Sequence, residues 1–212
     1  MKISILCSDK DHPINPWVNR WIGDNRGRCE IDLVRDVEEL RGGDLLFLIS
    51  CHQIVNSSHR SKYSSTLVVH ASDLPKGRGW SPYIWDLLEG ADCITVSLLE
   101  AEDGVDTGAI WAKRTFEVKN HQLIDEINSE LFETELMLMS EALLLFGSQH
   151  TPEKQDESKA TYYRRRTPAD SEIDPEDSLR TSFNKIRLMD WKRYPAFFYM
   201  NGFKYSIKLV KE

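Results

Sequence analysis

Short apolar segments alternate with segments of helical pattern through the first half of the chain, and this alternation limits the folds open to it. The run DLLFLIS, residues 44–50, is almost continuously apolar, which is typical of a strand buried on both faces of a sheet. TLVVH, residues 66–70, has the same character. Further strands are expected at KISILC, EIDLV, CITVSLLE and AIWAKRTFEV. Strands separated by helices indicate βαβ units, in which the strands run parallel.

Helices are predicted between these strands and after them. A helix is expected over residues 13–22, a short one in VEELRGG, and another in PYIWDLLEG, which ends at a glycine as helices often do. Over residues 121–146 the apolar side chains recur at the spacing of one helix face. We therefore predict an α/β fold with a Rossmann-like, mostly parallel sheet and flanking helices, plus a small C-terminal helix and β-hairpin.

The composition changes after the long predicted helix. Residues 148–160 are polar and are predicted to link a domain over residues 1–147 to a C-terminal extension over residues 161–212. In the extension, DPEDSLRTSFNKIRLMD is expected to form a helix, and the Asn201-Gly202 pair between two β-prone runs predicts a hairpin. The open edges of this hairpin could pair with a second copy of the chain in a homodimer.

Charge and cysteine content argue against several classes of protein. The chain has 212 residues and a net charge of −7, and an acidic surface is a poor match for nucleic acid, whose phosphates need basic partners. No apolar run approaches the roughly 20 residues of a membrane-spanning helix, and the N-terminal segment lacks the pattern of a signal peptide. The four cysteines form no CxxC pair. We expect reduced cysteines in a cytoplasmic protein, without a metal site and without a membrane partner.

Polar side chains follow three of the predicted strands where each strand ends. His70 closes one strand, Cys51 and His52 follow another, and Asp106 lies in the loop after CITVSLLE. Because ligands of parallel α/β sheets bind at the carboxyl ends of the strands, we expect these groups to converge on one binding site.

Two motifs in this region resemble those of a known family. His70-Ala-Ser-Asp-Leu-Pro75 is followed by a Gly/Arg-rich loop and Trp80-Ser-Pro82, and Gly104-Val-Asp-Thr-Gly108 comes later. Together they resemble the HPSLLP and DxGxDTG motifs of the 10-formyltetrahydrofolate-dependent formyltransferases, at a similar spacing. The resemblance spans about residues 44–146. TYYRRRTPADSEID and RYPAFF also resemble tail segments of the amino-sugar and methionyl-tRNA branches.

The resemblance implies N10-formyltetrahydrofolate as the formyl donor, and it assigns roles to residues of this chain. His70 would move a proton and contact the oxyanion, as suits a side chain that titrates near neutral pH. Asp106 would orient His70 and relay protons. The segments implied to line the folate pocket are Cys51, His52, Gln53 and Ile54, Ser72, Asp73, Leu74 and Pro75, together with Asp106.

The loop after His70 and a basic cluster in the tail are candidates for acceptor binding. Lys76, Arg78 and Trp80 could contact the acceptor substrate, although Lys76 and Arg78 could equally be solvated charges. Arg164–Arg166 could bind a diphosphate or carboxylate of the acceptor. Alternatively, these arginines form ion pairs with Asp170 or Glu172 in a solvated loop.

One position departs from the family pattern. The family carries an asparagine two residues before the histidine, where it polarises the formyl carbonyl, and this chain has Val68. Loss of one oxyanion donor costs about 100- to 1000-fold in rate. We expect His52 or Gln53 to supply the missing donor, and we count His52 among the catalytic candidates.

The sequence therefore predicts an N-formyltransferase that acts on the amine of an amino sugar, free or nucleotide-linked, in surface-glycan synthesis. HASDLPKGRGWSP resembles enzymes of pathways related to pseudaminic acid. Three alternatives remain: a methionyl-tRNA formyltransferase-like enzyme, a formyl-folate hydrolase, and a folate-binding pseudoenzyme. The net charge and the lack of room for a full C-terminal barrel argue against the tRNA alternative.

Overall fold

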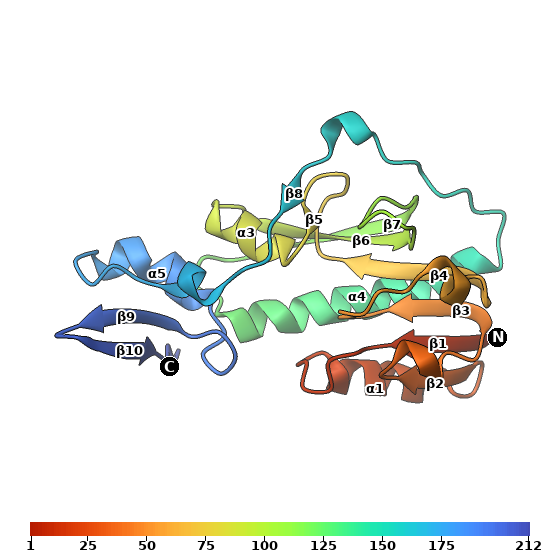
Figure 1. Ribbon diagram of the computed structural model, residues 1–212, viewed down its shortest axis with the longest axis horizontal. Helices are drawn as coiled ribbons and strands as arrows, with labels where there is room; N and C mark the ends of the chain where they lie inside the picture. The colour runs from red at the N-terminus through yellow and green to blue at the C-terminus, as the bar shows by residue number, and fades with distance from the viewer.

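The computed structural model describes residues 1–212 and is built around a six-stranded sheet (Figure 1). The strand order is β2-β1-β3-β4-β6-β7. The first four strands in this order are parallel, and β6 and β7 are antiparallel to their neighbours. The prediction of a mostly parallel α/β sheet is confirmed. The strands are β1 (Lys2–Leu6), β2 (Glu30–Val34), β3 (Gly43–Leu48), β4 (Tyr63–His70), β6 (Cys93–Glu100) and β7 (Ile110–Glu117).

Helices pack on the sheet and enclose the main core. The longest, α4 (Ile124–Phe146), contacts β6, β7 and α1 (Asn15–Asn25), and its buried face includes Ile127, Leu131 and Leu138. The remaining helices of this part are α2 (Ser57–Arg60), α3 (Pro82–Leu88) and the 3-10 turn η1 (Val37–Glu39). The last is shorter than the sequence suggested, because the backbone is already extended at Leu40 and β3 begins at Gly43. No helix has both the length and the apolar character needed to cross a lipid bilayer.

The C-terminal extension lies at one end of α4 (Figure 1). It contains η3 (Pro168–Ser171), α5 (Leu179–Arg187) and the hairpin of β9 (Ala196–Met200) and β10 (Phe203–Ile207). The side chain of Ser178 caps α5 by accepting a hydrogen bond from the N–H of Thr181. Asn201 and Gly202 both have positive φ, as a two-residue hairpin turn requires. The predicted hairpin is therefore confirmed.

The segment predicted as a linker, residues 148–160, forms hydrogen bonds with the rest of the protein. After α4 it arches back across the molecule to β8 (Tyr162–Tyr163), which pairs in parallel with β5 (Arg78–Gly79) (Figure 1). On the way Glu153 pairs with Ile110, and η2 (Glu157–Lys159) forms one 3-10 turn. The path is set by single hydrogen bonds rather than by an apolar stripe, so the hydrophobic pattern of the sequence contains no sign of it.

Candidate active site

His70 is the last residue of β4 and lies where the strand ends at the rim of the sheet. It is 9% exposed, and its Nε2 lies 2.9 Å from the carbonyl oxygen of Gly77. The same nitrogen lies 3.6 Å from Oδ2 of Asp106, as predicted from the two motifs. The carbonyl oxygen of Gly77 orients the ring, and the carboxylate of Asp106 beside it can stabilise the imidazole when it is charged.

The tight loop between β6 and β7 presents Asp106 to His70. Asp106 has φ of +55°, a conformation that non-glycine residues rarely adopt, and its Oδ2 accepts a hydrogen bond of 2.9 Å from the N–H of Gly79. Gly108 follows in the same loop, and a Cβ there would lie 1.9 Å from the carbonyl oxygen of Glu100. Only glycine fits at this close approach, which explains the second glycine of the GVDTG motif.

The structure corrects the role predicted for Arg78. Its side chain is completely buried, so it cannot contact an acceptor substrate. Its guanidinium is enclosed by Gln155, Glu157 and Tyr162, and the hydrogen bond to Glu157 raises its pKa above the ordinary value. Lys76 and Trp80, in contrast, are exposed and remain candidates for acceptor contact.

The predicted folate segment after β3 forms an irregular loop. His52 is exposed, and its ring lies 5.8 Å from that of Trp80, which places it at the same rim of the site. Ile54 is 87% exposed, and the thiol of Cys51 contacts the carbonyl oxygen of Gln53. The side chain of Gln53 donates to Asp36 and accepts from the N–H of Val37. Gln53 is therefore not free to act as an oxyanion donor, which corrects that expectation.

The predicted folate segment after His70 divides into buried and exposed side chains. Ser72 is 2% exposed and Leu74 is 1% exposed, so only their backbone groups can contribute to a pocket. Asp73 is exposed and forms an ion pair of 2.6 Å with Lys113, and Pro75 is half-buried. Side-chain contacts from Ser72 and Leu74 to a ligand are therefore excluded in this conformation.

Val68 lies on the same face of β4 as His70, because the two residues are two apart in a strand. It is half-buried and packs against a small cluster of Leu74, Leu99 and Ile110. The wall beside His70 is thus apolar, with no side-chain donor at position 68. A wall of this kind, together with the backbone groups of strand-end loops, fits a flat heterocycle such as a pterin.

The three arginines of the basic cluster, Arg164–Arg166, each contact a different group. Arg164 forms a double hydrogen bond with Asp170, and this guanidinium holds the pKa of the Asp170 carboxyl well below its usual range. Arg165 stacks over the ring of Trp80 at 4.8 Å, and Arg166 is half-buried against the sulfur of Met189. The ion-pair alternative therefore holds for Arg164, while Arg165 lies beside Trp80 at the rim.

The sequence interpretation missed Gln155, whose side chain reaches the loop that carries Asp106. Its Nε2 donates to the carbonyl oxygens of Asp106 and Gly108, each at 2.8 Å. Gln155 stands in the polar segment taken as a linker, and no spacing or periodicity distinguishes it there.

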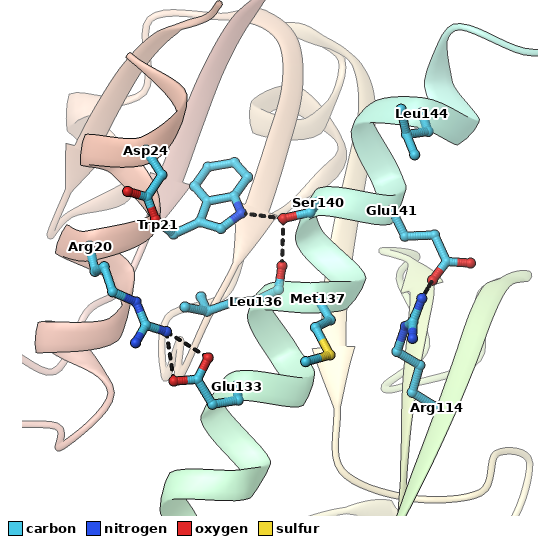
Figure 2. Close-up of a pocket in the computed structure, with 10 residues that line it drawn as sticks. All are labelled: Arg20, Trp21, Asp24, Arg114, Glu133, Leu136, Met137, Ser140, Glu141 and Leu144. Atoms are coloured by element: carbon cyan, nitrogen blue, oxygen red, sulfur yellow. Dashed lines mark hydrogen bonds and ion pairs between the residues drawn. The ribbon is translucent and has the colours of Figure 1, made fainter. Parts of the chain in front are cut away.

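A hollow lies away from this rim, between α1, α4 and β7 (Figure 2). It has a volume of 680 Å³, and ion pairs Arg20–Glu133 and Arg114–Glu141 flank it on two sides. Figure 2 shows Trp21 donating to Ser140 at its wall. None of the predicted site residues lines this hollow, so it has no part in the site around His70.

Residues 8–143 match the family described as formyl transferase, and the chain belongs to this family. Among curated relatives, the methionyl-tRNA formyltransferase of Sulfurovum sp. (strain NBC37-1) is 32% identical over 144 residues, which are 68% of this chain and 46% of the relative. The chain therefore spans about half the length of that relative.

Solved structures share the fold. HypX from Aquifex aeolicus in complex with tetrahydrofolic acid superposes with a TM-score of 0.81 at 23% identity, over 96% of this chain and 36% of that one. A sugar N-formyltransferase from a Shewanella species superposes with a TM-score of 0.76 at 16% identity, over 100% of this chain and 98% of that one. At these identities the likeness establishes the fold alone.

Proposed function

We propose that this chain transfers the formyl group of N10-formyltetrahydrofolate to the amine of an amino sugar. The observation that carries the proposal is the pairing of His70 with Asp106 at 3.6 Å, at the carboxyl rim of a formyl transferase fold. The choice of a folate donor is supported by one of the superposed structures, that of HypX, which holds tetrahydrofolic acid.

The donor supplies an activated formyl carbon, and the residues of this chain manage protons and charge around it. The acceptor amine loses a proton as its bond to the formyl carbon forms, and the folate nitrogen gains one as the old bond breaks. His70 is proposed to accept the first proton and deliver the second; its Nε2 lies 3.6 Å from Asp106 and 2.9 Å from the carbonyl oxygen of Gly77. Asp106 holds the imidazole and stabilises it when charged.

The acceptor is proposed from charge and shape. A net charge of −7 disfavours tRNA, whose phosphates need basic partners. Exposed Trp80, with Arg165 stacked on it, offers an aromatic and cationic surface for a sugar or a linked diphosphate. A sugar of a pathway related to pseudaminic acid is the more specific proposal, resting on the HASDLPKGRGWSP motif.

A methionyl-tRNA acceptor is the second candidate, because a relative 32% identical bears that name. We place the enzyme in the cytoplasm, in line with four cysteines that are all free.

We also propose a homodimer through the edges of the β9–β10 hairpin, where Tyr199, Phe203 and Tyr205 are exposed. Light scattering that finds only monomers at working concentrations would remove the dimer.

The test is a panel of amines incubated with the protein and N10-formyltetrahydrofolate, with both products followed by mass spectrometry. Formylation of a 4-amino sugar, free or nucleotide-linked, is the expected result. Formyl-methionyl-tRNA as the sole product would favour the second candidate. Tetrahydrofolate release without any amine would identify a hydrolase, and folate binding without turnover on any member would identify a pseudoenzyme.

A further inference from the structure

The buried guanidinium of Arg78 lies at the centre of a hydrogen-bonded cluster behind the active site. It donates to Oε1 of Gln155 from Nε and Nη2, at 3.2 and 2.7 Å. It also donates to both carboxylate oxygens of Glu157, at 2.8 and 2.6 Å, and to the hydroxyl of Tyr162 at 2.9 Å. All five N–H groups of a guanidinium have partners available here, which is how a buried charge is tolerated.

The backbone on either side of Arg78 contacts both members of the catalytic pair. The carbonyl oxygen of Gly77 lies 2.9 Å from Nε2 of His70. The N–H of Gly79 donates to Oδ2 of Asp106 at 2.9 Å. Fixing Arg78 therefore fixes the two backbone groups that orient His70 and Asp106.

Gln155 joins this cluster to the loop that carries Asp106. Its Oε1 accepts from Arg78, and its Nε2 donates to the carbonyl oxygens of Asp106 and Gly108 at 2.8 Å each. Asp106 has a positive φ, a conformation that persists only where the surroundings impose it. The amide of Gln155 supplies two of the contacts that impose it.

Further bonds hold the same stretch of chain against the site. The N–H of Gly77 donates to Oγ1 of Thr161 at 2.8 Å, and the N–H of Arg78 donates to the carbonyl oxygen of the same residue at 2.9 Å. A Cβ at Gly79 would lie 2.4 Å from the carbonyl oxygen of Tyr163, so the two strands approach too closely for any other residue. Residues 153–163 thus contact both loops of the site.

We propose that residues 153–163 form a catalytic clamp, in which Gln155 is a positioning residue that holds Asp106 in line with His70. The effect of this clamp on kcat rests on the proposed function, because it can be measured only if the protein transfers a formyl group. Gln155 touches no reacting atom; it acts through the backbone of Asp106. The clamp makes the segment after α4 part of the active site rather than a tether to the extension.

The test compares two substitutions at one position. Gln155→Glu keeps oxygen acceptors for Arg78 but replaces the donor amide with an oxygen that repels the two carbonyl oxygens. Gln155→Met removes both kinds of contact at similar length. The clamp predicts that both variants lower kcat about 100-fold, the loss expected for a misplacement near 1 Å, while KM for the folate changes less than threefold.

Gln122→Met is the matched control. Gln122 is also half-buried and bonded at both ends of its amide, to the N–H of Lys119 and to Glu130, but it lies in the turn just before α4. It should leave kcat unchanged. Wild-type kcat in Gln155→Glu would overturn the clamp. Equal losses of kcat and folate binding in Gln155→Glu, together with a lowered Tm, would also overturn it, because they would indicate general destabilisation.

Amide hydrogen exchange separates failure of the clamp from failure of the proposed function. In both Gln155 variants the peptide covering residues 104–109 should exchange about tenfold faster. In Gln155→Glu, which keeps an acceptor for Arg78, the Tm and the peptides outside residues 76–80 and 153–163 should be unchanged, whereas Gln155→Met leaves two N–H groups of Arg78 without a partner and should also lower the Tm. If the wild-type protein turns over no amine, the proposed function fails, and faster exchange confined to this loop still supports the clamp. Unchanged exchange in the loop overturns it.

Discussion

At the scale of single residues, we propose that position 68 limits how strongly the site can stabilise an oxyanion. Val68 shares the face of His70 and lines an apolar wall, while Gln53 is occupied by Asp36 and Val37. His52 remains exposed beside Trp80, and we propose that its imidazole replaces the missing donor.

Val68→Asn should therefore raise kcat for formyl transfer, by up to about 100-fold, because it restores a hydrogen-bond donor beside His70. Steady-state release of tetrahydrofolate in the presence of the best amine measures the effect. Val68→Leu adds bulk without a donor and should not raise kcat. Equal or lower turnover in Val68→Asn would show that another group already fills the role.

His70 and Asp106 could be recognised from sequence because both lie in short motifs at strand ends. Arg78 could not be placed correctly in the same way, since an arginine between two glycines gives no sign of whether it faces solvent. Its burial depends on Gln155 and Glu157, which follow it by 77 and 79 residues in the chain. A pairing that distant has no local pattern.

At the scale of secondary-structure elements, α4 carries a carboxyl group that burial alone perturbs. Burial raises the pKa of Glu135 to about 8, and no side-chain hydrogen bond compensates it. In the unfolded chain this carboxyl titrates near 4.5. The folded protein therefore holds a proton that the unfolded chain has lost between these two values, and stability falls as pH rises through that window.

Glu135→Gln should stabilise the protein at pH 7.5 by about 2 kcal/mol, because the amide is neutral in both states. The gain should vanish below about pH 4, where the carboxyl is protonated in both states. Urea unfolding at the two pH values measures this difference. Glu130→Gln, an exposed position on the same helix, should change stability by less than about 0.5 kcal/mol at either pH. A destabilised Glu135→Gln at pH 7.5 would contradict this account.

Elements with a strong hydrophobic period were predictable, and those held by isolated polar contacts were not. The buried strands β3 and β4 and the face of α4 follow directly from the order of apolar residues. β5 and β8 have two residues each and are fixed by pairing with each other, so their sequences show no strand pattern.

At the scale of the whole molecule, the C-terminal extension shares the main core, because Ile186, Met189 and Ala196 belong to the same buried cluster as the strands of the sheet. The segment over residues 153–163 is a second connection between the two (Figure 1). β6 is antiparallel to its neighbour β4, so the loop after β6 has to fold back along the sheet to bring Asp106 within 3.6 Å of His70. The hairpin and α5 attach beyond this rim, and the open hollow between α1 and α4 lies elsewhere (Figure 2). The architecture thus concentrates the residues with acid–base chemistry at one place.

The central claim is that His70 and Asp106 together transfer protons during formyl transfer. Its most direct test is the rate of formylated product, followed by mass spectrometry with the best amine of the panel, in wild type and in Asp106→Asn. Asp106→Asn keeps the shape of the side chain and removes its charge, and we predict a fall in kcat of about 100- to 10,000-fold with folate binding retained. Wild-type kcat in Asp106→Asn would contradict the account.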